Sequence, residues 1–125
     1  MTEMLSIGQA AQRTRLSVHA LRFYESEGLL ANPVRRSGGR RVYSEDDVDW
    51  INLCVILRAS GMPIPVIRAY TELVRQGAGN ETDRLALLQD HRAVVIEQIA
   101  ELTRCLDLIS FKVGVYEDIL AVATP

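Results

Sequence analysis

Residues 17–43 read SVHALRFYESEGLLANPVRRSGGRRVY, and this stretch decides how the rest of the chain is interpreted. Its first part predicts a short amphipathic helix that ends at Gly28. Its second part predicts two short strands joined by a glycine-rich turn. Within this hairpin four arginines fall in seven residues: Arg35, Arg36, Arg40 and Arg41. Because such close guanidinium groups repel one another unless anions lie among them, the pattern predicts contacts with phosphate groups.

The residues before Gly28 predict two helices joined by a tight turn. Ser6 and Gln9 have the spacing of a capping box, which predicts a first helix that runs to about Thr14. Ser17 can cap the second helix, whose polar face carries His19, Arg22 and Tyr24. Two such helices are typical of a helix-turn-helix, and a basic hairpin after them predicts a winged helix.

The residues after the hairpin predict further helices and a domain boundary. Acidic residues follow Ser44, which predicts a well-buried third helix over about 44–60. Prolines at 63 and 65 fit only the first turn of a fourth helix, over about 64–75. The glycine-rich break at 77–80 divides the chain into a predicted domain of residues 1–79 and a dimerisation helix of residues 80–125.

The last third of the chain shows a regular alternation of three and four residues between apolar positions. We call these positions the seam: Leu85, Leu88, Arg92, Val95, Ile99, Leu102, Leu106, Ile109, Val113, Tyr116 and Leu120. The pattern predicts a helix over 85–120, about 54 Å long. A small domain cannot bury so long a stripe, so we expect a second copy to cover it, chiefly at Val95, Ile99, Leu102, Leu106, Ile109 and Val113. The charged Arg92 either marks the edge of this contact or fixes its register.

Length and composition limit the classes of protein that need consideration. A chain of 125 residues with 48% apolar residues suits one compact domain, or a small domain and one long helix. The net charge of −2 hides an asymmetry, because residues 1–44 hold seven arginines and three glutamates. A local basic patch of this kind is compatible with nucleic-acid binding. Two distant cysteines and no long apolar run favour a reducing cytoplasm and no membrane partner.

Several segments together resemble a MerR-family transcription regulator. They read SIGQAA at 6–11, LSV at 16–18, ALRFYE at 20–25, GLL at 28–30, RRVYSEDD at 40–47 and LRASGM at 57–62. The resemblance implies a mainly α fold, with a winged helix-turn-helix followed by a long helix that forms an antiparallel coiled-coil dimer. Arg40 departs from the family pattern, which has an aromatic or aliphatic residue at that position. Pro63 also departs, since many relatives have a capping serine there.

The resemblance also implies partners and residue roles. Ser17, Val18, His19 and Arg22 would face the major groove, Tyr24 would contact phosphate, and Arg41 and Tyr43 would match the basic and aromatic positions of the wing. The implied partners are promoter DNA, a second copy of the chain and RNA polymerase. In the family the dimer binds promoters whose two elements are too widely spaced, then bends and untwists them. Such deformation costs on the order of 1–6 kcal/mol.

Other interpretations explain less of the sequence. A winged-helix architectural or excision factor would bend DNA without recruiting polymerase, and a coiled-coil interaction module would leave the wing arginines unexplained. An enzyme is disfavoured because no nucleophile–base pair stands out. No Cys or His follows Gly114, so we expect no metal and no cofactor. The sequence leaves open a small-molecule effector, the operator, the direction of regulation and the redox activity of Cys54 and Cys105.

Overall fold

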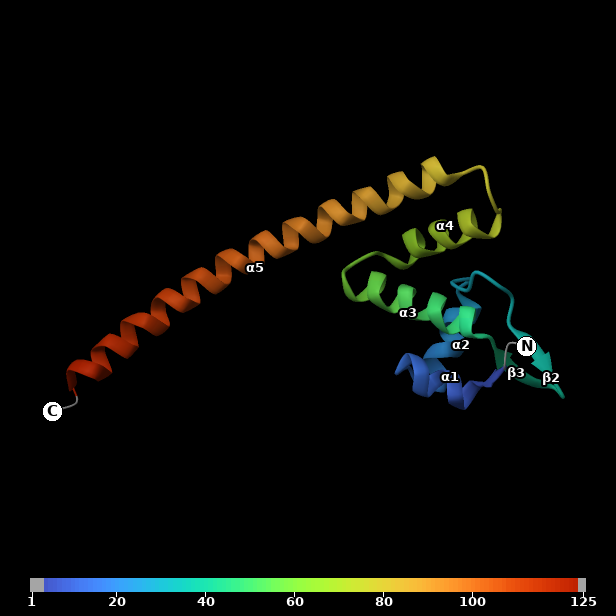
Figure 1. Ribbon diagram of the computed structural model, residues 1–125, viewed down its shortest axis with the longest axis horizontal. Helices are drawn as coiled ribbons and strands as arrows, with labels where there is room; N and C mark the ends of the chain where they lie inside the picture. The colour runs from blue at the N-terminus through green and yellow to red at the C-terminus, as the bar shows by residue number, and fades with distance from the viewer. Residues whose placement is uncertain (1–3, 124–125) are drawn as a thin grey trace. The chain divides into compact units, whose positions relative to one another are not determined.

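The computed structural model describes residues 4–123 and divides into two units, one that ends at Leu87 and one that begins at Leu88. Within the described residues the first unit contains four helices and a small sheet, and the second consists of most of a fifth helix (Figure 1). The boundary between the units lies inside this last helix, α5, whereas the sequence-based boundary at residue 79 lies in the loop before it. Leu87, near the start of α5, packs against the core of the first unit.

The first two helices begin and end where local capping signals place them. In α1 (Ile7–Thr14) the Ser6 N–H donates to Gln9 Oε1 at 2.9 Å, and the Gln9 N–H donates to Ser6 Oγ at 3.2 Å. This is the predicted capping box. Arg15 ends α1 with a left-handed φ of 60°, and Ser17 caps α2 (Val18–Ser26). The two helices form the predicted helix-turn-helix.

The hairpin forms a three-stranded antiparallel sheet with a short strand from the N-terminal segment. Strand β3 (Arg40–Tyr43) lies between β2 (Arg35–Ser37) and β1 (Leu5–Ser6). Gly38 and Gly39 have φ of 58° and 77°, as a two-residue turn between twisted strands requires. The predicted hairpin is therefore present as β2 and β3. The short strand β1 was not predicted from the sequence.

Helices α3 (Glu45–Ala59) and α4 (Ile64–Arg75) supply much of the core. Ser44 caps α3 in a second capping box with Asp47, while α4 starts at Pro63 without a side-chain cap, as expected. Buried residues of α3 include Val48, Ile51 and Cys54, so this helix is well buried on one side. Its opposite side is open, since Ile56 is 64% exposed.

Two long-range hydrogen bonds hold the segment that follows α2 against these helices. The Trp50 indole N–H donates to the Leu29 carbonyl at 2.7 Å, and Arg75 Nε donates to the Leu30 carbonyl at 2.9 Å. Trp50 also stacks on Tyr70, with ring centroids 5.7 Å apart. Leu29 and Leu30 are themselves buried. This apolar pair after α2 is thus fixed at both the side chains and the backbone.

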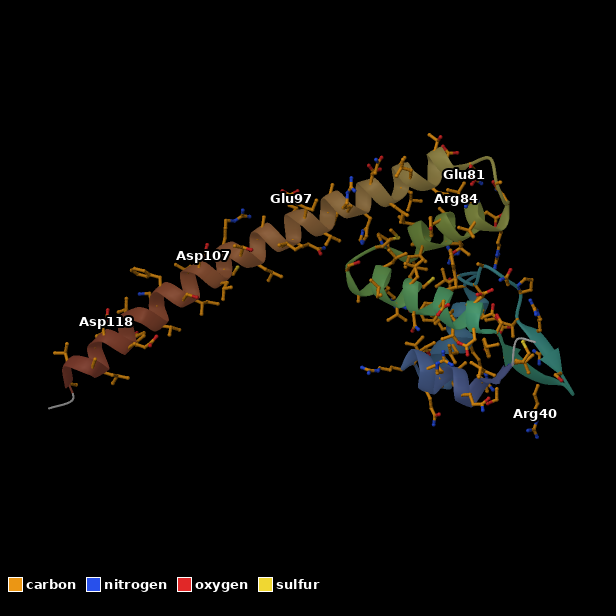
Figure 2. The ribbon with its side chains drawn as sticks, viewed as in Figure 1. Arg40, Glu81, Arg84, Glu97, Asp107 and Asp118 are labelled. Atoms are coloured by element: carbon orange, nitrogen blue, oxygen red, sulfur yellow. The ribbon has the colours of Figure 1, made fainter. Side chains whose placement is uncertain are left out.

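Helix α5 (Glu81–Ala123) extends beyond the predicted range of 85–120 at both ends. None of its described residues is buried. Figure 2 labels four acidic side chains along this helix, and all of them are exposed: Glu81, Glu97, Asp107 and Asp118. The mainly α architecture predicted from the sequence is therefore correct.

Candidate nucleic-acid interface

Helix α2 presents a polar edge to solvent. His19 and Arg22 are exposed, whereas Val18 is half-buried. Ser17 lies at the start of the helix, where its Oγ accepts the Ala20 N–H at 3.0 Å. This cap uses one lone pair of the Ser17 oxygen, so the hydroxyl proton and the second lone pair remain for another partner.

The β2–β3 hairpin, which we call the wing (residues 35–43), projects guanidinium groups. Arg35, Arg36 and Arg40 are exposed, and Arg40 extends away from the rest of the hairpin (Figure 2). Arg36 Nη1 donates to the Gly39 carbonyl at 3.4 Å, a weak contact that leaves most of its donors free. The cross-strand pairing of Arg36 with Arg41 places two like charges together. Such a pair favours an anion between its members.

Arg41 connects the wing to α2. Its Nε donates to Glu25 Oε2 at 2.7 Å, with about a quarter of the Arg41 side chain and a third of the Glu25 side chain exposed. This geometry uses one of the five guanidinium donors, so the Nη groups stay available. The ion pair fixes the wing relative to the helix that carries Arg22.

Two hollows flank this connection, and Arg22 and Arg41 line both of them. The first, about 590 Å³, is lined by His19, Arg22, Phe23, Glu25, Ser26 and Arg41. The second, about 400 Å³, lies between the wing and the start of α1 and is lined by Ser6, Ile7, Gly8, Arg22, Arg36, Gly39, Arg40 and Arg41. In the second hollow the first amides of α1 add partial positive charge to four guanidinium groups. Such surroundings suit an anionic group such as a backbone phosphate.

Tyr24 and Tyr43 lie in the core rather than on this surface. Tyr24 is 3% exposed and packs edge-on against Phe23, with ring centroids 6.1 Å apart. Tyr43 is 0% exposed, and its buried hydroxyl has no hydrogen-bond partner within the described residues. Burial, reinforced by the nearby Glu25 carboxylate, raises the pKa of Tyr43. The expected contacts of these two rings with DNA therefore gain no support from their positions, which point to a packing role.

A third hollow, of about 490 Å³, was not anticipated from the sequence. It lies between α2 and α3 and is mostly apolar, with Leu16, Phe23, Val55 and Arg58 among its lining residues. The Arg58 guanidinium lies over the Phe23 ring, 5.2 Å from its centroid. Because these residues are more than 30 positions apart, no local spacing could have revealed the contact.

The seam on α5 is the second candidate surface. In the single chain most of its positions from Ile99 to Tyr116 are at least half exposed to solvent. The exposed fractions are 59% for Ile99, 69% for Leu102, 62% for Leu106, 60% for Ile109, 50% for Val113 and 62% for Tyr116. Val95 is half-buried. Apolar side chains that lie off the seam are also exposed, a feature missed from the sequence: Val94, Ile96, Leu108, Phe111, Ile119 and Val122. An exposed apolar stripe of this length indicates an interaction surface.

The two cysteines occupy different environments. The Cys54 thiol is buried and donates to the Leu29 carbonyl at 3.6 Å, and burial raises its pKa to about 11. It is therefore protonated, and a poor nucleophile, at neutral pH. Cys105 is exposed on α5. Among residues 4–123 no three His, Cys, Asp or Glu side chains gather as a metal site would require, and no helix there is long and apolar enough to span a bilayer.

Comparison with known proteins agrees with this geometry. Residues 5–73 match the family model described as MerR HTH family regulatory protein, and residues 48–110 match the model described as MerR, DNA binding. An uncharacterised HTH-type transcriptional regulator from Haemophilus influenzae is 36% identical over 109 residues, which are 87% of this chain and 81% of that protein.

Solved structures agree as well. HiNmlR, a MerR family regulator lacking the sensor domain and bound to promoter DNA, superposes with a TM-score of 0.84 and 34% identity over 95% of this chain and 94% of its own. A MerR family transcriptional regulator from Listeria monocytogenes gives a TM-score of 0.85 at 29% identity over 90% of this chain and 86% of its own. The fold, the basic wing and these matches lead to one assignment: the chain belongs to the MerR family of DNA-binding transcriptional regulators.

Proposed function

We propose that two copies of this chain, joined through α5, bind one promoter duplex and change its shape. The observation that carries the proposal is that Arg22 of α2 and Arg41 of the wing line the same two hollows. A helix and a wing that share basic hollows can contact a base edge and the neighbouring phosphates together. The exposed seam supplies the surface for the second copy.

Within this proposal the exposed groups divide into two roles. His19 and Arg22, on the open edge of α2, read base edges in the major groove, with Ser17 and Val18 beside them. Arg35, Arg36, Arg40 and Arg41 hold the backbone phosphates. No cofactor or catalytic group takes part. The protein works where promoter DNA is found, in the cytoplasm of a bacterial cell.

Binding to a two-fold symmetric duplex tests the proposal directly. Titrations at several salt concentrations should show the affinity falling by about 0.9 log units per decade of salt for each phosphate contacted. A symmetric duplex should take up two chains, and a scrambled duplex of equal length should bind more weakly. An affinity that does not change with salt would exclude the wing as a phosphate-binding element.

Measuring both bending and transcription distinguishes promoter activation from the alternative of an architectural factor, which bends DNA without recruiting polymerase. Fluorescence energy transfer between the ends of the bound duplex should report bending. Transcription in vitro from a promoter with an over-long spacer should then rise when protein and any effector are added. Bending without an effect on transcription, under any effector tried, would favour the architectural factor.

A further inference from the structure

The seam within the second unit reads almost the same in both directions. In chain order its residues are Leu88, Arg92, Val95, Ile99, Leu102, Leu106, Ile109, Val113, Tyr116 and Leu120. Positions that lie equally far on either side of Arg104 carry the same residue in four of the five pairs. The fifth pair is Arg92 with Tyr116. All ten lie on the one continuous helix α5.

We infer that two copies of α5, in the antiparallel arrangement that the resemblance to the MerR family implies, pair with the two-fold axis at Arg104. This inference rests on the proposed homodimer and specifies how its copies meet. In this register Leu102 faces the partner's Leu106, Ile99 faces the partner's Ile109, and Val95 faces the partner's Val113. Four of the five kinds of layer then hold two identical side chains, the fifth pairs Arg92 with Tyr116, and the full run from Leu88 to Leu120 is covered.

Shifting the axis by half a heptad removes this match. With the axis between Ile99 and Leu102, Val95 meets leucine and Arg92 meets isoleucine. With the axis between Leu106 and Ile109, Ile99 meets tyrosine and Leu88 has no opposite residue. Only the register centred on Arg104 covers all ten positions with like-sized layers. Uniform layers favour one register over neighbours in which wide and narrow layers are mixed.

The charge at Arg92 selects the same arrangement. In a parallel pair Arg92 would face its own copy, and two guanidinium groups would repel within the seam. In the register centred on Arg104 it faces the partner's Tyr116, whose ring can accept a cation, beside the carboxylate of the partner's Glu117. Arg92 therefore fixes both the direction and the register of the pair, the role that single polar groups take in coiled coils.

Disulfide trapping in the full-length protein with Cys105→Ser tests the register. Ile99→Cys combined with Ile109→Cys should give covalent dimers on oxidation, because facing seam positions are close enough for a disulfide. The two sites in one chain are about 15 Å apart and cannot join each other. Val95→Cys with Leu106→Cys, Ile99→Cys with Tyr116→Cys, and Ile99→Cys alone test the two shifted registers and the parallel pair. We expect at least tenfold less covalent dimer from each.

A covalent dimer formed mainly by any of these three controls would overturn the inference. So would the absence of covalent dimer from every variant while sedimentation shows a dimer. Symmetric-duplex binding is measured on the same unoxidised proteins. Variants that are dimeric, bind DNA and cross-link in another register refute the register alone, whereas monomers without DNA binding refute the proposed function too.

Cys105 provides a second measurement on the unaltered chain, in case the seam substitutions disturb the dimer. In the inferred register the two Cys105 residues lie about 3 Å apart along the helix axis, and in the shifted registers about 8 or 13 Å apart. A series of bismaleimides of increasing length should therefore cross-link wild-type protein best with the shortest reagent. A preference for the longest reagent would contradict an axis at Arg104.

Discussion

The two units of this molecule differ in whether they bury their own apolar side chains. Among the described residues, the first unit has four helices and a dozen buried apolar residues, so its chain covers its own core. The second unit is one long helix in which no described residue is buried. Stability in water requires burial of apolar surface, so the second unit depends on a surface from outside its own chain.

This difference predicts that separate substitutions can disrupt the assembly through α5 and the folding of the first unit. A substitution on α5 should change assembly and leave the first unit folded. A substitution in the first unit should change folding or DNA contacts and leave the association through α5 intact. The following predictions test that separation.

Leu102→Asp should have the largest effect. It places two carboxylates close to the inferred two-fold axis, where removal from water is costly, so the protein should sediment as a monomer at micromolar concentration. Leu108→Asp is the matched control, because Leu108 is equally exposed but lies off the seam. Fluorescence of Trp50 should show a folded first unit in both variants. A Leu102→Asp protein that stays dimeric would refute α5 as the dimerisation element.

Ile51→Ala should destabilise the first unit by about 2–5 kcal/mol, the usual cost of a large-to-small change in a core. Ile56→Ala makes the same change on the same helix at a side chain that is 64% exposed, and should cost about 0.5 kcal/mol or less. Urea denaturation monitored by Trp50 fluorescence measures both. Equal effects of the two substitutions would mean that Ile56 is covered in the assembled protein.

Arg22→Ala should weaken binding to the symmetric site by about 1–3 kcal/mol and affect random DNA much less. Arg41→Ala should weaken binding to the symmetric site and to random DNA about equally. It should also reduce the dependence of log affinity on log salt by the amount expected for about one phosphate contact. Fluorescence anisotropy with a matched and a scrambled duplex separates the two patterns. The reverse result would mean that base readout and phosphate binding are assigned to the wrong arginines.

Cys54→Ala should have the smallest effect, a change in how steeply stability falls at alkaline pH. The pKa of Cys54 rises from its ordinary value of 9.0 to about 11 in the fold, so the unfolded chain loses this proton first. The stability present below pH 9 is therefore lost as the pH rises toward 11. Cys54→Ala should remove this part of the decline in melting temperature and leave the part caused by Tyr43, whose pKa is also raised. An unchanged pH profile would show that Cys54 does not contribute.

Features set by neighbouring residues were predictable from the sequence. The first residues of α1, α3 and α4 follow from Ser6, Ser44 and Pro63, since these residues act on the first turn of each helix. The glycine pair at 38 and 39 predicts the wing turn for the same reason. Most of α5 follows from the seam, because a repeated spacing over ten turns leaves few alternatives, but the helix extends beyond the seam at both ends.

Features that depend on tertiary pairing were not predictable. Strand β1 has two residues and exists because it pairs with β3. The amphipathic pattern of α2 could not show that Tyr24 turns inward, because tyrosine suits both a core and a surface. Glu25 and Arg41 lie 16 residues apart, and only the folded hairpin brings them together. The candidate DNA-binding residues were thus easier to find than their partners within the chain.

The contact between Glu25 and Arg41 has a consequence for how this surface meets a polyanion. Glu25 acts as an internal counter-ion through Arg41 Nε, while the Nη groups stay open to a phosphate. A phosphate bound there gains less from charge neutralisation than it would at a guanidinium without an internal carboxylate. Non-specific binding depends on such neutralisation and is lowered, whereas a duplex that also fits α2 keeps its contacts to the bases. The Glu25 carboxylate therefore favours specific over non-specific binding at some cost in total affinity.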